Sequence, residues 1–187
     1  MRLNFVTGNA GKFAEVSTFI TTNRPDITLV QTVLDLPEIQ SSDQREIAVY
    51  KARHAFALLQ EPVLVDDSAV YFELYNQFPG ALAKLVYHGL GLAGLQRLYL
   101  PGDPASMQTV FVYYASPAKA LIAEGITTGT LVNPVDVLAH PAFPYNRIFI
   151  PDGAQVTYEV LEQEGRKDEF NHRIAALRKL LVLLEDE

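Results

Sequence analysis

The sequence predicts an α/β fold, because strand-like and helix-like patterns alternate from its first residues. Residues 3–6 are mostly apolar, a helical spacing of apolar residues follows, and residues 27–33 have the pattern of a second strand. Strand, helix and strand in this order indicate a βαβ unit with a parallel strand pair. A buried-type strand over residues 62–68 and an amphipathic helix over residues 172–184 extend the alternation.

The composition is that of an ordinary globular protein, with 49% hydrophobic and 20% charged residues in a chain of 187. We expect one domain over residues 1–187, because no internal repeat and no long linker divides the chain. The sequence has no apolar run of about 18 residues and no signal-peptide pattern. We therefore expect a cytoplasmic protein that does not span a membrane.

Cysteine content and charge exclude several function classes. The chain has no cysteine, which removes disulfides, thiolate nucleophiles and zinc-thiolate sites, so any metal must be bound by oxygen or imidazole. The formal net charge of −7 argues against binding a nucleic-acid polymer, which needs a large basic surface. A small anion can still be bound by a few local cations.

The first strand leads into a loop that favours anion binding. Thr7, Gly8 and Asn9 follow the strand, and Lys12 lies where the next helix begins. A helix N-terminus offers unpaired backbone N–H groups and the positive end of the helix dipole to an anion, and the lysine adds a point charge. The loop has neither a Walker A nor a G-x-G-x-x-G pattern. A tight turn with no ligand also explains its glycine.

The first two helices are predicted from apolar residues at three- and four-residue spacing. The first ends near residues 22–25, and the second follows an extended polar connection over residues 35–40 and runs to about residue 60. Ser41 and Gln44 have the spacing of a capping box at the start of the second helix. Lys51 lies at the border of its apolar stripe, where a lysine usually extends to solvent.

The strand over residues 62–68 ends in two carboxylates and a hydroxyl, Asp66, Asp67 and Ser68. Neighbouring strand residues point to opposite faces, so we expect both carboxylates to serve one site only where the strand ends and the chain bends. Paired acids at a strand end suit Mg²⁺, which takes hard oxygen ligands and keeps waters. Helix capping or turn chemistry is the alternative explanation of this acidic pair.

The rest of the chain is predicted to contain a strand over residues 69–74, short helices over 81–86 and 90–99, and a β-hairpin of residues 109–115 and 120–131. The aromatic residues Phe111, Tyr113 and Tyr114 fit sheet packing or a subunit contact. A loop over residues 133–151 carries side chains of special chemistry, which loops commonly use at sites. They are His140, Phe143, Tyr145, Asn146 and Arg147, of which His140 has no second histidine at metal-ligand spacing.

The order of these motifs resembles the inosine/xanthosine triphosphate pyrophosphatase family over nearly the whole chain. No single motif is specific, but the joint set is. The matching stretches are residues 7–12, Leu36-Pro37-Glu38, Lys51, Val65-Asp66-Asp67-Ser68, Pro79-Gly80 with Lys84, residues 149–153, and Lys167 with His172-Arg173 before Ala176-Leu177.

The resemblance implies an elongated, two-lobed α/β fold with a central mixed β-sheet flanked by helices, an active-site cleft between the lobes, and a homodimer. The implied activity is Mg²⁺-dependent hydrolysis of a non-canonical purine nucleoside triphosphate to the monophosphate and pyrophosphate, which cleans the nucleotide pool.

The resemblance also implies roles for individual residues. Glu38 and Asp66 would bind Mg²⁺, and Asp67 would take the proton from the attacking water. His172 and Arg173 would contact the 6-oxo group of the base, a hydrogen-bond acceptor that adenine lacks. The implied substrate-binding residues are Thr7, Gly8, Asn9, Lys12, Lys51, Ser68, Lys84, Phe143, Tyr145, Asn146, Lys167, His172 and Arg173.

The sequence departs from the family pattern at the base pocket. The family loop commonly reads Phe-Gly-aromatic-Asp-Pro, whereas this chain has Phe143-Pro144-Tyr145-Asn146-Arg147. A flexible glycine is thus replaced by a proline of fixed φ, and a carboxylate by an amide. Asn171 stands where the family has Ser, and Ala69 where it commonly has Gly. The phosphate and metal positions are intact, so these changes affect base selectivity more than hydrolysis.

Two alternatives remain open from the sequence. The enzyme could act on a triphosphate with a different or modified base that fits the Asn146 pocket. The chain could also be a nucleotide-binding protein whose catalysis has faded, although a pure binder has no need of Glu38, Asp66 and Asp67 together.

Overall fold

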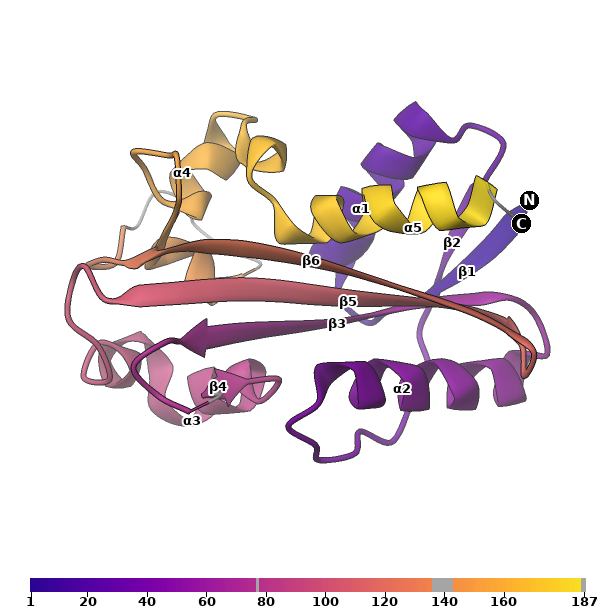
Figure 1. The fold of residues 1–187 in the computed structure, drawn as a ribbon, viewed down its shortest axis with the longest axis horizontal. Helices are drawn as coiled ribbons and strands as arrows, with labels where there is room; N and C mark the ends of the chain where they lie inside the picture. The colour runs from indigo at the N-terminus through magenta and orange to yellow at the C-terminus, as the bar shows by residue number, and fades with distance from the viewer. Residues whose placement is uncertain (77, 136–142, 186–187) are drawn as a thin grey trace. The chain divides into compact units, whose positions relative to one another are not determined.

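The strands and helices of the computed structural model, which describes residues 1–76, 78–135 and 143–185, confirm the α/β fold (Figure 1). In chain order they are β1 (Arg2–Val6), α1 (Ala10–Asn23), β2 (Thr28–Thr32), α2 (Gln44–Leu59), β3 (Val63–Phe72), β4 (Pro79–Gly80), α3 (Ala83–Leu95), β5 (Pro104–Ser116), β6 (Lys119–Leu131), η1 (Pro144–Arg147), β7 (Phe149–Pro151), α4 (Tyr158–Gln163), η2 (Lys167–Glu169) and α5 (His172–Glu185).

The strands form one mixed sheet of seven, in the order β2-β1-β3-β5-β6-β7, with β4 paired to β3. β1 is parallel to both β2 and β3, which confirms the predicted βαβ unit. β4 and β7 are antiparallel to their partners. β5 and β6 are joined by residues 117–118 as the predicted hairpin, and β5 begins five residues earlier than expected.

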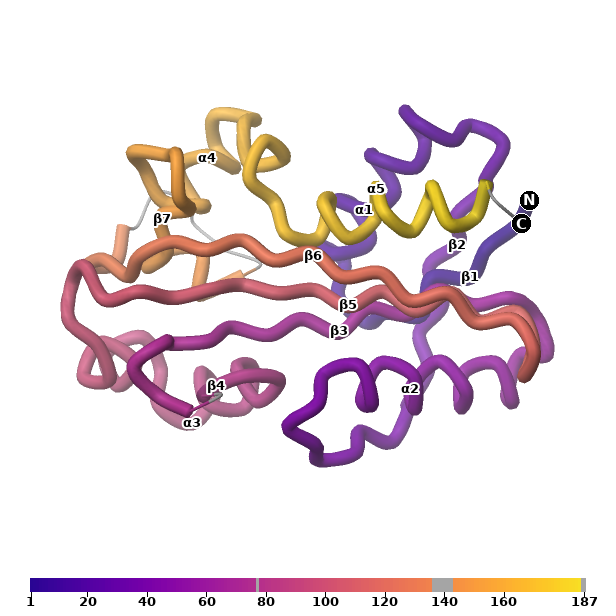
Figure 2. The backbone as a smooth tube through the Cα atoms, in the orientation of Figure 1, coloured from indigo at the N-terminus to yellow at the C-terminus, as the bar shows by residue number. Residues whose placement is uncertain are grey.

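The described chain divides into two compact units. Unit 1 comprises residues 1–67, 109–125 and 173–187, and unit 2 comprises residues 68–108 and 126–172. The long strands β3, β5 and β6 each contribute residues to both units (Figure 2). The single domain expected over residues 1–187 stays a prediction.

In unit 1, α1 and α5 cover one face of the sheet and α2 covers the other (Figure 1). On the first face, apolar side chains of both helices pack on Phe5, Leu64 and Phe111. On the second face, the alanines of α2 let the helix lie close to Val65 and Val112. Phe111, Tyr113 and Tyr114 all belong to these cores, so the prediction of sheet packing is confirmed.

Unit 2 has a core of its own, in which Phe72, Phe149 and Tyr158 are fully buried. The two short helices expected here appear as α3, whose helical geometry is interrupted at Gly91 with φ +61°. This left-handed conformation favours glycine. The sequence patterns did not predict α4 or η2.

Two local predictions are wrong. β3 does not end at Ser68 but continues to Phe72, so the separate strand expected over residues 69–74 is part of it, because Ala69, Val70 and Phe72 are buried and extend the strand. The N-cap of α2 is Asp43, whose carboxylate accepts from the backbone N–H groups of Arg45 and Glu46, and not Ser41, whose hydroxyl donates to Glu46 Oε2.

The predicted loop residue His140 lies outside the described residues. Among the helices that the structure describes, none is long and apolar enough to cross a membrane.

Candidate active site

Asp66 is a buried carboxylate held by two cations. Its Oδ2 lies 2.8 Å from Lys12 Nζ in the first turn of α1 and 3.4 Å from Arg173 Nε at the start of α5. The guanidinium of Arg173 also pairs with Glu15. Burial alone would raise the pKa of Asp66, but the charges of Lys12 and Arg173 lower it from 3.8 to about 2. Asp66 is therefore ionised at neutral pH.

Asp67 has a different environment on the same strand. Its Oδ1 lies 3.4 Å from Lys51 Nζ on α2, and its main-chain oxygen accepts from Gln44 Nε2 at 2.8 Å. Its Oδ2 is buried and has no hydrogen-bond partner among the described residues. Burial raises the pKa of Asp67, and Lys51 and Lys12 only partly oppose this effect. Asp67 is the more basic of the two acids.

The two carboxylates point to opposite faces of the sheet, as their place inside one strand requires. Asp66 contacts α1 and α5, whereas Asp67 contacts α2, which lies on the other face (Figure 1). The last β1–β3 pair is Phe5↔Leu64, so β3 continues past the end of β1 beside the following loop. The charge of each lysine acts on both carboxylates. The two acids are thus influenced by the same two lysines from opposite faces of β3.

The loop after β1 caps the N-terminus of α1 and leaves open space beside Gly8. Asn9 caps the helix, and its Oδ1 accepts from the backbone N–H of Lys12 at 3.1 Å. Thr7 Oγ1 accepts from the backbone N–H of Asn9 at 3.2 Å. A Cβ added to Gly8 would meet no atom within 4 Å. Gly8 is therefore not required by packing, and the space beside its backbone is open to a ligand.

Lys51 connects Asp67 with Glu38. Its Nζ lies 3.1 Å from Glu38 Oε1, and its side chain is only 16% exposed. Burial opposes its charge, but Asp67 and Glu38 together raise the pKa of Lys51. The expected solvent-side position is therefore wrong, because the ammonium is drawn between two carboxylates.

The carboxylate oxygens of the acidic residues are chemically suited to bind a hard divalent cation. Glu38, Asp66 and Asp67 offer carboxylate oxygens, and the orphaned Oδ2 of Asp67 is a buried anionic oxygen without a donor. Within residues 1–76, 78–135 and 143–185, no three His, Cys, Asp or Glu side chains are already gathered as a metal cage. The donor atoms are therefore of the kind that binds a hard divalent cation with few carboxylates and additional waters.

A second group of predicted residues gathers in unit 2. Lys167 Nζ lies 4.7 Å from the centre of the Phe143 ring and 6.0 Å from that of Tyr158. The Tyr158 ring in turn lies 6.3 Å from that of His172. Asn146 is buried beside them in η1 and donates from Nδ2 to Glu162 Oε2 at 3.2 Å. Aromatic faces, a cation and an amide are a suitable set for a planar base.

The positions of three other predicted residues, Tyr145, Lys84 and Ser68, give weaker support for a role in ligand binding. The Tyr145 hydroxyl donates to the main-chain oxygen of Ala83 at 2.8 Å, and its buried ring packs near Phe72. Burial raises the pKa of Tyr145. Lys84 is exposed in the first turn of α3, and Ser68 is half-buried next to Asp67 on β3.

The sequence did not predict several contacts of the site. Glu15 is the second partner of Arg173, and its position one turn after Lys12 on α1 was the available signal. Buried Gln44 and the acceptor Glu162 carried no signal, because polar residues on a helix are usually solvated. Arg147, which replaces the proline of the family loop, pairs with the fully buried Glu159 at 3.1 Å.

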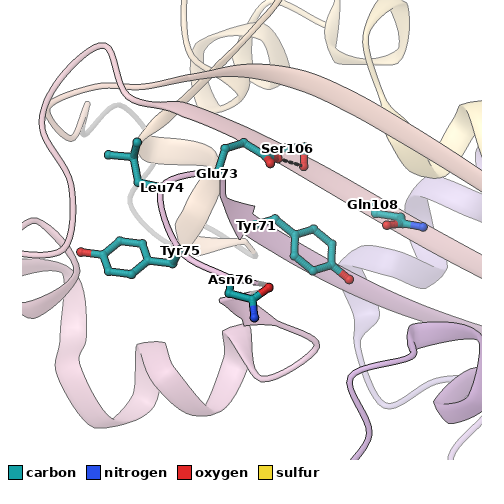
Figure 3. A pocket seen from close by; sticks show the side chains of 7 residues that line it. All are labelled: Tyr71, Glu73, Leu74, Tyr75, Asn76, Ser106 and Gln108. Carbon is teal, nitrogen blue, oxygen red and sulfur yellow. Dashed lines mark hydrogen bonds between the residues drawn. The ribbon is translucent and has the colours of Figure 1, made fainter.

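A separate hollow of about 460 Å³ lies in unit 2 (Figure 3). It contains none of the predicted site residues, and its carboxylate Glu73 already accepts from Ser106 Oγ at 2.6 Å. The lining residues are Tyr71, Glu73, Leu74, Tyr75, Asn76, Ser106 and Gln108.

Comparisons with known proteins cover nearly the whole chain. The model of the Ham1 family matches residues 3–183. The inosine triphosphate pyrophosphatase of Scheffersomyces stipitis is 33% identical over 95% of this chain and 95% of its own length. The dITP/XTP pyrophosphatase of Methanopyrus kandleri is 32% identical over 96% of this chain and 94% of its own length. A solved HAM1 protein from Coxiella burnetii, 23% identical, covers 100% of both chains with a TM-score of 0.75, and shares the fold.

Proposed function

Because the chain belongs to the Ham1 family, we propose that it is a pyrophosphatase that hydrolyses non-canonical purine nucleoside triphosphates, of the inosine and xanthosine kind, to the monophosphate and pyrophosphate. The observation that carries catalysis is the pair Asp66 and Asp67: Asp66 is held by Lys12 and Arg173, whereas Asp67 has a buried oxygen with no hydrogen-bond partner among the described residues. A pair of acids separated in this way is typical of sites that need one permanent anion and one base. This feature disfavours a binder without catalysis.

The loop after β1 is proposed to bind the triphosphate. The first backbone N–H groups of α1 lack intrahelical acceptors and lie at the positive end of the helix dipole. Lys12 and Lys51 add positive charge on either side of β3, and Gly8 leaves room for phosphate oxygens. Thr7, Asn9, Ser68 and Lys84 are the remaining residues proposed for this role.

Asp67 is proposed as the base that takes a proton from the attacking water. Its Oδ2 has no hydrogen-bond partner among the described residues, so it is the oxygen proposed to accept from that water. Its raised pKa strengthens the base relative to Asp66. Lys51 orients the carboxylate by holding Oδ1 at 3.4 Å.

Glu38 and Asp66 are proposed to hold Mg²⁺. A bound ion would neutralise part of the negative charge of the phosphates. The donor set is consistent with this role, because both residues offer carboxylate oxygens. The lowered pKa of Asp66 keeps its carboxylate ionised near neutral pH, with Oδ2 held by Lys12 and Arg173.

The base is proposed to bind at Phe143, Tyr145, Asn146, Lys167, His172 and Arg173. The Phe143 ring provides a stacking face below Lys167. His172 is buried beside Tyr158, where its ring can donate to a 6-oxo group. We further propose a cytoplasmic homodimer, which light scattering on the purified protein would test.

Release of pyrophosphate is the test of the proposed function. Purified protein with Mg²⁺ should release pyrophosphate from inosine and xanthosine triphosphates much faster than from ATP. Equal rates for all purine triphosphates would contradict the proposed selectivity. If no triphosphate were hydrolysed, the assignment as an enzyme would be wrong.

A further inference from the structure

We propose that Glu162 on α4 is a positioning residue that sets base selectivity, because it fixes the Asn146 amide so that its oxygen is presented to a 6-oxopurine. This inference rests on the proposed function and assigns the source of its selectivity. The sequence patterns do not point to Glu162.

The direction of the Asn146 amide follows from its partner. Asn146 is 5% exposed, and its side-chain nitrogen lies 3.2 Å from Glu162 Oε2. An ionised carboxylate accepts hydrogen bonds and donates none, so the NH₂ end of the amide must face Glu162. The amide oxygen therefore faces away from Glu162. Hydrogen bonds to a charged acceptor are stronger than neutral ones, so the carboxylate holds this orientation.

Glu162 also connects the Asn146 amide with the Phe143 ring through Lys167. Its Oε2 accepts from Lys167 Nζ at 3.4 Å, and that ammonium lies 4.7 Å from the centre of the Phe143 ring. One carboxylate oxygen thus links the amide, the cation and the aromatic ring. A change at Glu162 should affect the group that recognises the base while leaving Asp66 and Asp67 untouched.

The fixed orientation has a chemical consequence for base choice. A 6-oxopurine such as hypoxanthine or xanthine carries a hydrogen on N1 and needs an acceptor there. Adenine has no hydrogen on N1 and needs a donor. A carboxylate at residue 146 would accept at either oxygen, whereas an amide accepts only at its oxygen. Asn146 can therefore select a 6-oxopurine only if its amide is held in one direction, and Glu162 provides that restraint.

Exchanging the two side-chain types tests the proposal. Glu162→Gln removes the charged acceptor, and Asn146→Asp places two carboxylates against each other. Glu162→Gln should lower the ratio of kcat/KM for inosine triphosphate to that for ATP by about tenfold or more. Asn146→Asp still offers an acceptor at either oxygen, so it should keep the ratio but lower the melting temperature because two carboxylates face each other. In the double variant Asn146→Asp/Glu162→Gln the hydrogen bond is reversed, the total charge is unchanged, and an acceptor oxygen remains. Its ratio should return to within about threefold of the original.

Glu164→Gln is the matched control, because Glu164 lies two residues away and pairs with half-exposed Arg166 at 3.0 Å. This variant should keep the original ratio. If Glu162 had only a structural role, its substitution would lower the melting temperature or kcat without changing the ratio, and the exchange would not rescue it. That result would overturn the inference.

Binding of the monophosphates separates this inference from the proposed function. Dissociation constants for inosine and adenosine monophosphates should show the same loss and recovery of selectivity across the variants. If the wild type hydrolysed inosine triphosphate but Glu162→Gln kept the full preference, Glu162 would be excluded and the function would stand. If no triphosphate were hydrolysed but the monophosphate preference followed Glu162, the function would fail and the inference would stand.

Discussion

Asp66 and Asp67 are neighbours on β3, yet they are paired with lysines on opposite faces of the sheet. Asp66 Oδ2 lies 2.8 Å from Lys12 Nζ, and Asp67 Oδ1 lies 3.4 Å from Lys51 Nζ. Asp66 has a second cation in Arg173, whereas Asp67 keeps one oxygen without a partner among the described residues. Two identical side chains are thus given different acidities by their surroundings.

Asp67→Asn should abolish turnover without damaging the fold. The amide cannot take a proton from water, so kcat should fall by about 10²- to 10⁴-fold. The substitution also removes a buried charge that is only partly paired, so the melting temperature should stay equal or rise. Pyrophosphate release and thermal melting check the two effects. Turnover equal to that of the wild type would exclude Asp67 as the base.

Asp66→Asn is the contrasting variant, because it should damage stability. It leaves the buried cations Lys12 and Arg173 without their shared anion, which costs about 3 kcal/mol. For a chain of this size the melting temperature should fall by about 6–12 °C. An unchanged melting temperature would show that Glu15 alone suffices for Arg173.

The stability conferred by Asp66 should depend on pH. Its pKa is about 2 in the folded chain and about 3.8 when unfolded, so the unfolded state binds the proton more readily. The stabilisation is present above pH of about 4 and is lost as the pH falls towards 2. Denaturation in urea between pH 2 and 6 should show this loss in the wild type and a smaller one in Asp66→Asn.

Hydrolysis should have an acid limb set by Asp67. Burial raises the pKa of Asp67 above its ordinary 3.8, and the base works only when deprotonated. The value of kcat/KM should therefore rise with pH and reach half its maximum at a higher pH than an ordinary aspartate gives. A pH profile of pyrophosphate release measures this midpoint. A midpoint at or below pH 3.8 would contradict the assignment.

Gly8→Ala should weaken substrate binding while leaving the fold intact. An added Cβ meets no protein atom within 4 Å, and Gly8 does not adopt positive φ. The methyl group would occupy the space proposed for phosphate oxygens, so KM should rise by about tenfold. Gly89→Ala is the control, because its added Cβ is equally unobstructed but lies on α3. Equal KM values for both variants would place the triphosphate elsewhere.

Removal of divalent cations should stop hydrolysis and leave the fold unchanged. The lysines already pair with Asp66, Asp67 and Glu38, so the carboxylates do not need a metal to remain buried. EDTA should abolish pyrophosphate release, Mg²⁺ should restore it, and the melting temperature should change little. Full activity in EDTA would exclude a role for Mg²⁺.

The sequence by itself determined the α/β class, the βαβ start and the hairpin, because period-2 and helical apolar patterns are local properties. It also marked Lys12 at the start of a helix, and Asp66 and Asp67 as two acids that follow an apolar run. The motif order further indicated the family, because that order extends along nearly the whole chain.

Only the tertiary structure decided which charges meet. Arg173 is 107 residues from Asp66 in sequence, and no periodicity in either segment specifies that pair. From the sequence, Glu162 is indistinguishable from a solvated helix residue. It contacts Asn146 only because α4 packs beside η1 in the folded chain. Local patterns set where a side chain points, but long-range packing sets what it meets and how far its pKa shifts, because burial and neighbouring charges depend on the whole fold.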